Sequence, residues 1–213
     1  MATVTVRGRA VADVQPDRVR LLLALQAEAA AGRDALALLA QRWDAAAAAL
    51  DRAGDLVLQR RPAAVTVSPM WSRDGAPAGQ AARRVVTVEA RPGGPLGELL
   101  AALVAVPGGT VESVEWLVEP DNPAHARLRA AAVLDARARV LDYAGAAGLR
   151  LGALEQIAEP DAGGPGEPPR AVMLSFAEQA AAAPGPVLEL RPEPVQVRAE
   201  VVVRYALLPG SQG

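Results

Sequence analysis

The sequence contains no cysteine and no lysine. Without cysteine the chain can form no disulfide, offers no thiolate nucleophile and cannot hold zinc through sulfur. Without lysine it cannot complete the phosphate-binding loop G-x-x-x-x-G-K-[ST], whose lysine reaches the phosphates. These absences remove several common enzyme classes before any residue is placed.

Aromatic side chains and unbalanced charge are also scarce. Only 3% of the 213 residues are aromatic whereas 51% are hydrophobic, so we expect a core of Leu, Val and Ala. The formal net charge of -2 leaves no basic stripe of the kind that binds nucleic acid. The length suits one large domain or two small lobes that share a core.

Long apolar runs are missing as well. No stretch reaches the roughly 20 apolar residues of a membrane-spanning helix. The N-terminus, MATVTVRGRAVADVQPDR, carries charges where a signal peptide has an apolar run. We therefore expect a cytoplasmic protein without a membrane span; the alternative is an envelope protein whose leader has been removed.

Short runs of apolar residues predict a series of strands. The clearest strand covers 195–207, where apolar residues alternate with polar ones such as Gln196 and Arg198. The first strand covers 3–6 and is expected to stop at Gly8, forming a hairpin with the second. The expected strands are residues 3–6, 19–25, 65–71, 84–90, 111–118, 151–157, 172–176 and 195–207.

Three helices are expected between these strands. Gly32 opens the first helix and Gly54 caps its end. Its apolar stripe consists of Leu36, Leu39, Trp43, Ala47 and Leu50. Pro95 begins a short second helix. Asn122 caps the start of the third helix, and Gly148 closes it.

The order β-β-α-β-β-α-β-α-β-β-β predicts an α+β fold, with antiparallel β-sheets packed against three α-helices. We expect a single domain over 1–213; the alternative is two lobes that meet near 108–111. Residues 160–169 and 180–194 are predicted to be flexible loops, because they are rich in Pro, Gly and Ala.

The third helix holds the densest mixture of apolar and charged residues. A turn of about 100° per residue predicts an apolar face of Leu134, Ala138, Leu141 and Gly145. It also brings Asp135, Arg139 and Asp142 together on another face. We interpret the charged row as a solvated surface. The alternative, two carboxylates holding a metal ion or a proton, is weakened by the arginine between them.

His125 is the only histidine of the sequence and follows Asp121 by about one helical turn. A general base oriented by a carboxylate is conceivable there. However, no serine lies in a G-x-S-x-G elbow, and a triad needs a third partner. We therefore favour an exposed His125 and assign no catalytic, cofactor-binding or metal-binding residue. We expect that the protein is not an enzyme and needs no cofactor.

Trp71, Arg83 and Arg84 are the candidate residues for contact with a partner protein. Trp71 ends a strand beside a predicted flexible loop over 72–80, where it serves either as a contact anchor or as a lid over the edge of the core. The doublets Arg60–Arg61 and Arg83–Arg84 could attract an anionic partner. We favour charge that guards an edge strand against aggregation, because the overall charge is balanced.

The order and spacing of several segments resemble the SIMPL-domain family over nearly the whole chain. The most specific segment is the third helix, AAAVLDARA (130–138), which runs into AGLRLG (147–152). The other segments are VRG (6–8), QPDRV (15–19), VTVSP (65–69), GELL (97–100), VESV (111–114), IAE (157–159) and VVVRY (201–205).

The resemblance implies an α+β protein that forms oligomers and whose activity is unassigned, and it carries over no catalytic residue. It also implies export to the bacterial envelope, from which this chain departs by lacking an export signal. We expect a non-catalytic assembly or interaction protein, a homo-oligomer that acts as a scaffold for an unknown protein partner. The alternative is a module that binds a small apolar ligand between the helices and the sheet.

Overall fold

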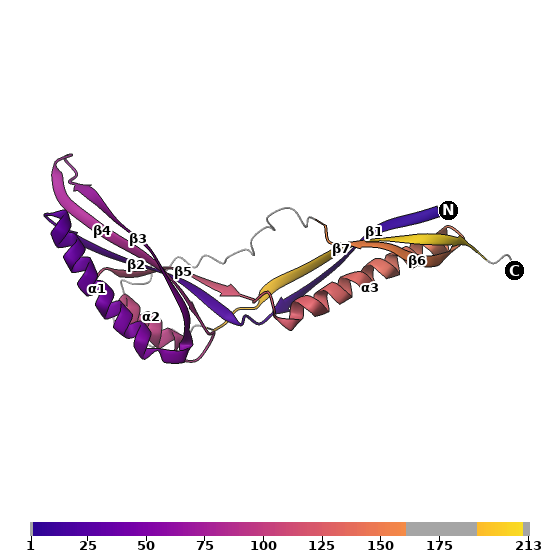
Figure 1. Ribbon diagram of the computed structural model, residues 1–213, viewed down its shortest axis with the longest axis horizontal. Helices are drawn as coiled ribbons and strands as arrows, with labels where there is room; N and C mark the ends of the chain where they lie inside the picture. The colour runs from indigo at the N-terminus through magenta and orange to yellow at the C-terminus, as the bar shows by residue number, and fades with distance from the viewer. Residues whose placement is uncertain (1, 161–190, 211–213) are drawn as a thin grey trace. The chain divides into compact units, whose positions relative to one another are not determined.

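The computed structural model describes residues 2–160 and 191–210 (Figure 1). The chain divides into two compact units. We call residues 16–117 the central unit, to which 191–193 are also assigned. The terminal unit combines 2–15 and 118–160 with 194–210.

The central unit is a four-stranded antiparallel sheet in the order β3-β4-β2-β5. Two α-helices and a 3-10 helix accompany it (Figure 1). The elements in chain order are β2 (Arg18–Ala29), α1 (Gly32–Arg52), η1 (Gly54–Leu56), β3 (Val57–Trp71), β4 (Pro77–Ala90), α2 (Leu96–Val104) and β5 (Gly109–Leu117).

The core of the central unit follows from the alternation along its middle strand. Every second residue of β2 from Val19 to Leu25 is fully buried. Leu50 of α1 and Leu103 of α2 are fully buried as well, and both helices contact strands of this sheet. Leucines therefore fill the layer between sheet and helices, as the shortage of aromatic residues predicted.

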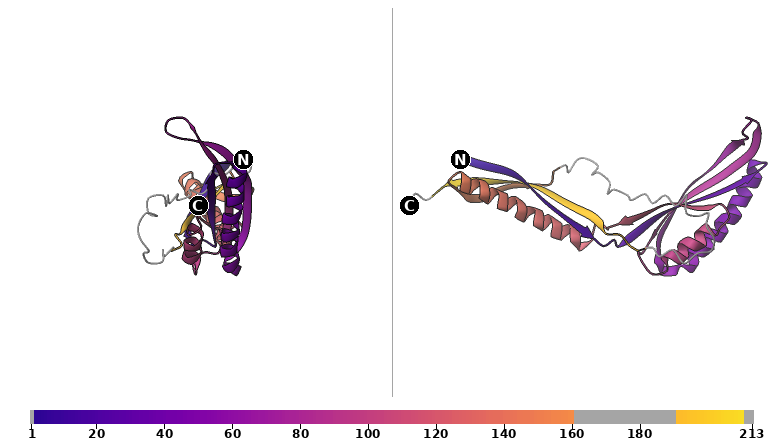
Figure 2. Two further views of the ribbon diagram at one scale, coloured as in Figure 1. Left: turned by 90° about the vertical axis from the view of Figure 1, so that its left-hand side faces the viewer. Right: turned by 180° about the vertical axis from the view of Figure 1, so that it is seen from behind.

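The terminal unit is a three-stranded antiparallel sheet in the order β1-β7-β6, with α3 along one face (Figure 2). The first strand of the chain pairs with the last one described. The elements are β1 (Ala2–Val14), α3 (Pro123–Ala146), β6 (Leu149–Ala158) and β7 (Val195–Pro209). As expected, Asn122 caps α3: its side-chain Oδ1 accepts from the Ala124 amide at 2.8 Å.

The two units together confirm the α+β class with antiparallel sheets and three α-helices. The expected hairpin between the first two strands is wrong. β1 pairs with β7 along its whole length, whereas β2 lies between β4 and β5. A short connection predicted pairing, but each strand finds its apolar partners in a different sheet.

The predicted buried face of α3 is also wrong. The buried row is spaced four residues apart: Ala124, Leu128, Ala132, Ala136, Val140 and Ala144. By contrast, Leu134 is 64% exposed, and Leu141 is exposed as well. The small residues face the sheet because they allow the helix backbone to approach it closely.

Gly8 is the residue on β1 that makes this approach possible, and it does not end the strand as predicted. A Cβ atom at Gly8 would lie 2.0 Å from the Ala132 carbonyl oxygen and 2.6 Å from the Ala136 Cβ. Glycine is therefore required here for close packing of helix on strand rather than for a turn.

Most strands extend beyond their predicted bounds. β3 starts at Val57 rather than Val65, and β4 starts at Pro77, so the loop between them is shorter than expected. The strand expected at 172–176 lies outside the described residues, as do 161–169 and 180–190 of the expected loops. The single domain over 1–213 and the lobe junction near 108–111 stay predictions.

Candidate functional site

The outer edge of β3 is the most unusual surface of the central unit. β3 is an edge strand, because it pairs with β4 alone. All residues from 61 to 69 are exposed, and no charged residue occurs between Arg61 and Arg73. We call residues 62–71 (PAAVTVSPMW) the β3 edge. It combines high strand propensity with unpaired backbone groups and no charge.

Trp71 ends β3 and is 63% exposed. The turn that follows is held by hydrogen bonds between its own residues: the Ser72 amide donates to the Ala76 carbonyl at 2.9 Å, and the Ala76 amide donates to the Ser72 hydroxyl at 3.2 Å. Gly75 adopts a φ of +76°, a conformation that favours glycine. The indole is thus exposed at the end of a hydrogen-bonded hairpin, and its role as a contact anchor or as a lid stays a prediction.

Arg83 and Arg84 do not gather around Trp71. As consecutive residues of β4 they point to opposite faces of the sheet. Arg83 forms an ion pair with Glu112 of β5. Arg84 lies over the ring of Trp43, 4.8 Å from its centroid, so Trp43 is half-buried rather than part of the core. Their role in partner contact stays a prediction.

The arginine doublets therefore differ in position. Arg60 and Arg61 lie on the edge strand β3, where Arg60 pairs with Asp51 at 2.6 Å. Arg83 and Arg84 lie on β4, inside the sheet between β3 and β2. Only the first doublet has the position of an edge guard, and it stands at one end of the β3 edge.

A carboxylate is buried on β4, and no sequence pattern predicted it. The Glu89 side chain is 7% exposed and accepts from Arg18 at 2.7 Å and from Arg20 at 3.4 Å. Arg20 also reaches Glu115 at 3.1 Å. The hydrogen bond from Arg18 lowers the pKa of Glu89 below its ordinary value, and the charge of Arg20 adds to this. These interactions tie β2, β4 and β5 together.

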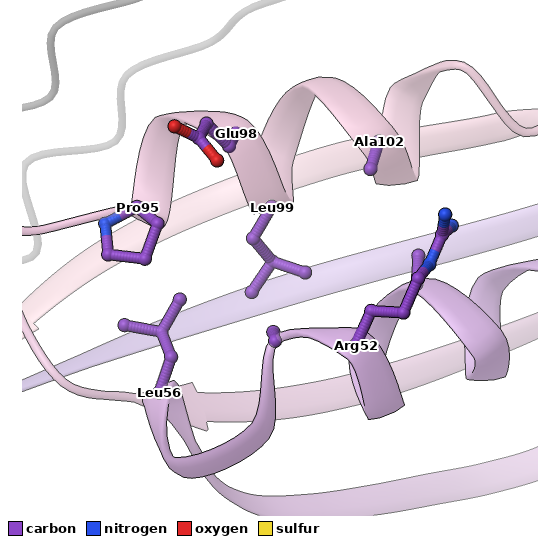
Figure 3. A pocket seen from close by; sticks show the side chains of 8 residues that line it. Arg52, Leu56, Pro95, Glu98, Leu99 and Ala102 are labelled. Carbon is purple, nitrogen blue, oxygen red and sulfur yellow. The ribbon is translucent and has the colours of Figure 1, made fainter.

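A groove of about 270 Å³ lies between α1 and α2 (Figure 3). Leu56 and Leu99 point into it, and Pro95 lies at one end. Arg52 and Glu98 add charged groups to its lining. The groove separates the two helices, so it is not the space between helices and sheet in which an apolar ligand was expected.

The charged row on α3 contains one residue with a structural role. The Asp135 carboxylate accepts from the backbone amide of Arg9 on β1 at 2.9 Å and pairs with Arg139 at 3.1 Å. The hydrogen bond from the Arg9 backbone amide lowers the pKa of Asp135, and the hydrogen bond and charge of Arg139 lower it further. Asp135 therefore occupies a backbone donor of the edge strand β1, whereas Asp142, about two turns further along α3, is exposed.

His125 and Asp121 do not form a recognisable catalytic pair. Asp121 is exposed, and the His125 imidazole is half-buried with its Nε2 atom unpartnered among the described residues. Within residues 2–160 and 191–210, no three His, Asp or Glu side chains come close enough together to hold a metal ion.

Among the described residues, no helix is both long enough and apolar enough to cross a membrane.

Comparison with known proteins identifies the family of the chain. No curated protein matches the chain. A family model with the description "Protein of unknown function (DUF541)" matches residues 4–205, which includes every helix and nearly every strand residue of both units. The chain belongs to the SIMPL family.

Proposed function

We propose that the chain is a non-catalytic assembly protein that forms homo-oligomers through the β3 edge. The observation that carries the proposal is the run from 62 to 71, which is uncharged, lies on an edge strand and is exposed at all but one residue. Monomeric proteins blunt such edges with charges, prolines or a covering segment. Here Pro62 and Pro69 interrupt the edge, and the pairing with β4 shifts between Pro62 and Val65, but residues 65–68 between them pair in regular register.

Pairing of two β3 edges satisfies the backbone groups of both copies. An antiparallel pair about a twofold axis uses the same surface twice and continues the order β3-β4-β2-β5 into a second sheet. Val65 and Val67, each exposed, then meet side chains of the second copy. Each cross-strand pair contributes about 0.2–1 kcal/mol. Trp71 extends the contact beyond the strand as an anchor.

The experiment compares two valine-to-lysine variants. Val67 on the β3 edge and Val104 on α2 are similarly exposed, at 42% and 48%. Lysine at 67 places an unpaired charge in the proposed contact, whereas lysine at 104 remains in solvent. In sedimentation at micromolar concentrations we expect a discrete oligomer for wild type and Val104→Lys, and a monomer for Val67→Lys.

Circular dichroism spectra of both variants check that the fold is retained. Wild type that sediments as a monomer at every micromolar concentration contradicts the proposal, and so does a Val67→Lys variant that assembles like wild type. Turnover of an ester or phosphoester panel that is lost in His125→Ala contradicts its non-catalytic part.

The second candidate is a module that binds a small apolar ligand. It is favoured by the groove between α1 and α2, whose lining includes Leu56, Leu99 and Pro95. Its volume of about 270 Å³ lies just below the range of about 300–1,000 Å³ that is typical of small-molecule sites. Sedimentation distinguishes the two candidates, because only the scaffold requires association between copies of the chain.

A further inference from the structure

A second concave site lies within the terminal unit, where α3 begins. It has a volume of about 320 Å³. Its side chains come from the first turns of α3, from β1, from β7 and from the two residues that follow β6. The ones that matter are Arg7, His125, Arg129, Glu159, Arg198 and Glu200.

Arginines outnumber carboxylates in this pocket: Arg7, Arg129 and Arg198 line it together with Glu159 and Glu200. Glu200 is shared between two arginines, because its Oε1 atom lies 2.8 Å from Arg7 Nε and 3.4 Å from Arg9 Nε. Arg198 donates to the neutral amide oxygen of Gln196, at 3.1 Å from Nε and 2.6 Å from Nη2. No ion pair within the described part of the chain reaches the guanidinium groups of Arg129 or Arg198.

His125 supplies an independent indication of a ligand. Its Nε2 atom is buried and has no hydrogen-bond partner in the described residues, although His125 lines the pocket. A buried ring nitrogen is normally satisfied by a protein group, a water or a ligand. A polar group bound in this pocket would provide the missing partner.

We propose that this pocket binds a tetrahedral oxyanion, the phosphate group of a small molecule or inorganic phosphate. Guanidinium groups match phosphate oxygens in charge and geometry, and they form charge-assisted hydrogen bonds with them. The N-terminal end of α3, a helix of 24 residues, adds a positive partial charge on the same side. Arg129 and Arg198 provide the charge, and the His125 imidazole lines the same pocket.

The sole histidine of the sequence makes the test specific. Imidazole signals of isotope-labelled protein are followed by NMR while inorganic phosphate is added at fixed pH and ionic strength. We expect a saturable shift of the His125 signals. The affinity should fall by roughly tenfold in Arg198→Gln and in Arg129→Gln, because each variant removes a charge-assisted bond. Arg137→Gln, on the same helix but outside the pocket, is the control.

Two further titrations define the ligand. Glycerol phosphate distinguishes the sources: tighter binding than inorganic phosphate indicates a phosphate ester, and equal or weaker binding indicates free phosphate. Sodium acetate tests the preference for a tetrahedral anion. The proposal is overturned if the His125 signals do not saturate with either phosphate compound, if acetate binds equally well, or if both arginine variants match wild type. The same titration in Val67→Lys keeps the result independent of assembly.

Discussion

Gly8 offers the sharpest test of how the terminal unit is built. In the Gly8→Ala variant the added Cβ would lie 2.0 Å from the Ala132 carbonyl oxygen and 2.7 Å from the Ala136 amide nitrogen. Real Cβ atoms essentially never approach closer than 3.0 Å. The difference between 3.0 and 2.0 Å requires β1 and α3 to separate by about 1 Å. Both obstructing atoms belong to the helix backbone, so no side chain can move aside.

The expected cost follows from what this separation disturbs. Overpacking a well-filled core costs about 1–3 kcal/mol. Here the shift also loosens Ala132 and Ala136, which are fully buried, and lengthens the 2.9 Å bond from the Arg9 amide to Asp135. We therefore expect the free energy of unfolding of the terminal unit to fall by about 3 kcal/mol, the upper end of that range.

Denaturant unfolding followed by circular dichroism measures this loss, and Gly145→Ala is the matched control. Gly145 lies within α3, and a Cβ added there meets nothing within 4 Å. Alanine at 145 should stabilise the helix by roughly 0.5–1 kcal/mol. If Gly8→Ala is as stable as wild type, to within about 0.5 kcal/mol, the close contact between β1 and α3 is refuted.

Two further predictions concern the central unit. Glu89→Gln should lower stability at pH 7 by about 2 kcal/mol, less than a fully buried pair because Arg18 and Arg20 are partly exposed. Since its pKa is lowered from 4.5, ionised Glu89 stabilises the fold above that value, and this stability is lost as the pH falls through the lowered pKa. The free energy of unfolding should therefore fall less between pH 7 and pH 3 in Glu89→Gln than in wild type. Glu112→Gln is the control. If this free energy falls equally with pH in wild type and in Glu89→Gln, Glu89 does not have the role proposed. For the groove, an apolar fluorescent dye should bind wild type and Ala101→Phe but not Ala102→Phe, since only Ala102 lines it. Absence of dye binding by wild type would count against the second candidate.

The sequence predicted elements better than it predicted their partners. Alternation identified β2 and β7, and Asn122 identified the start of α3, because both signals are local. The pairing of β1 with β7 joins residues about 200 positions apart and leaves no local signal. The short connection between β1 and β2 favoured a hairpin instead, and neither β1 nor β2 contains a residue that forbids this hairpin.

The buried face of α3 was mispredicted for a geometric reason. The helical wheel assumes that the buried residues point in one direction along the whole helix. The observed row advances in steps of four residues, so it drifts by about 40° per step and about 200° over five steps. Such a drift follows a twisted sheet. In an alanine-rich helix hydrophobicity hardly distinguishes the two sides, and contact with Gly8 decides between them.

The candidate sites also differ in whether a local stretch of sequence could predict them. Exposure of Trp71 followed from its place beside a loop, and the structure confirms it. The edge position of β3 depends on the order of strands in the sheet, which no window of sequence contains. The pocket at His125 joins residues from three elements and from the segment after β6, so the sequence presented His125 and Arg198 only as separate polar residues.

The charges along the edge strands explain why β3, rather than another strand, is proposed to pair between copies. Among the described residues, four strands lie at sheet edges: β1, β6, β3 and β5. β1 carries Arg7 and Arg9, and Asp135 occupies the Arg9 amide. β5 contains Glu112 and Glu115 along its middle, and β6 contains Arg150 and Glu155. β3 alone runs for ten residues without a charge, from 62 to 71. Because an added strand must desolvate every charge along the edge that it covers, the β3 edge is the one at which a second copy encounters the smallest penalty.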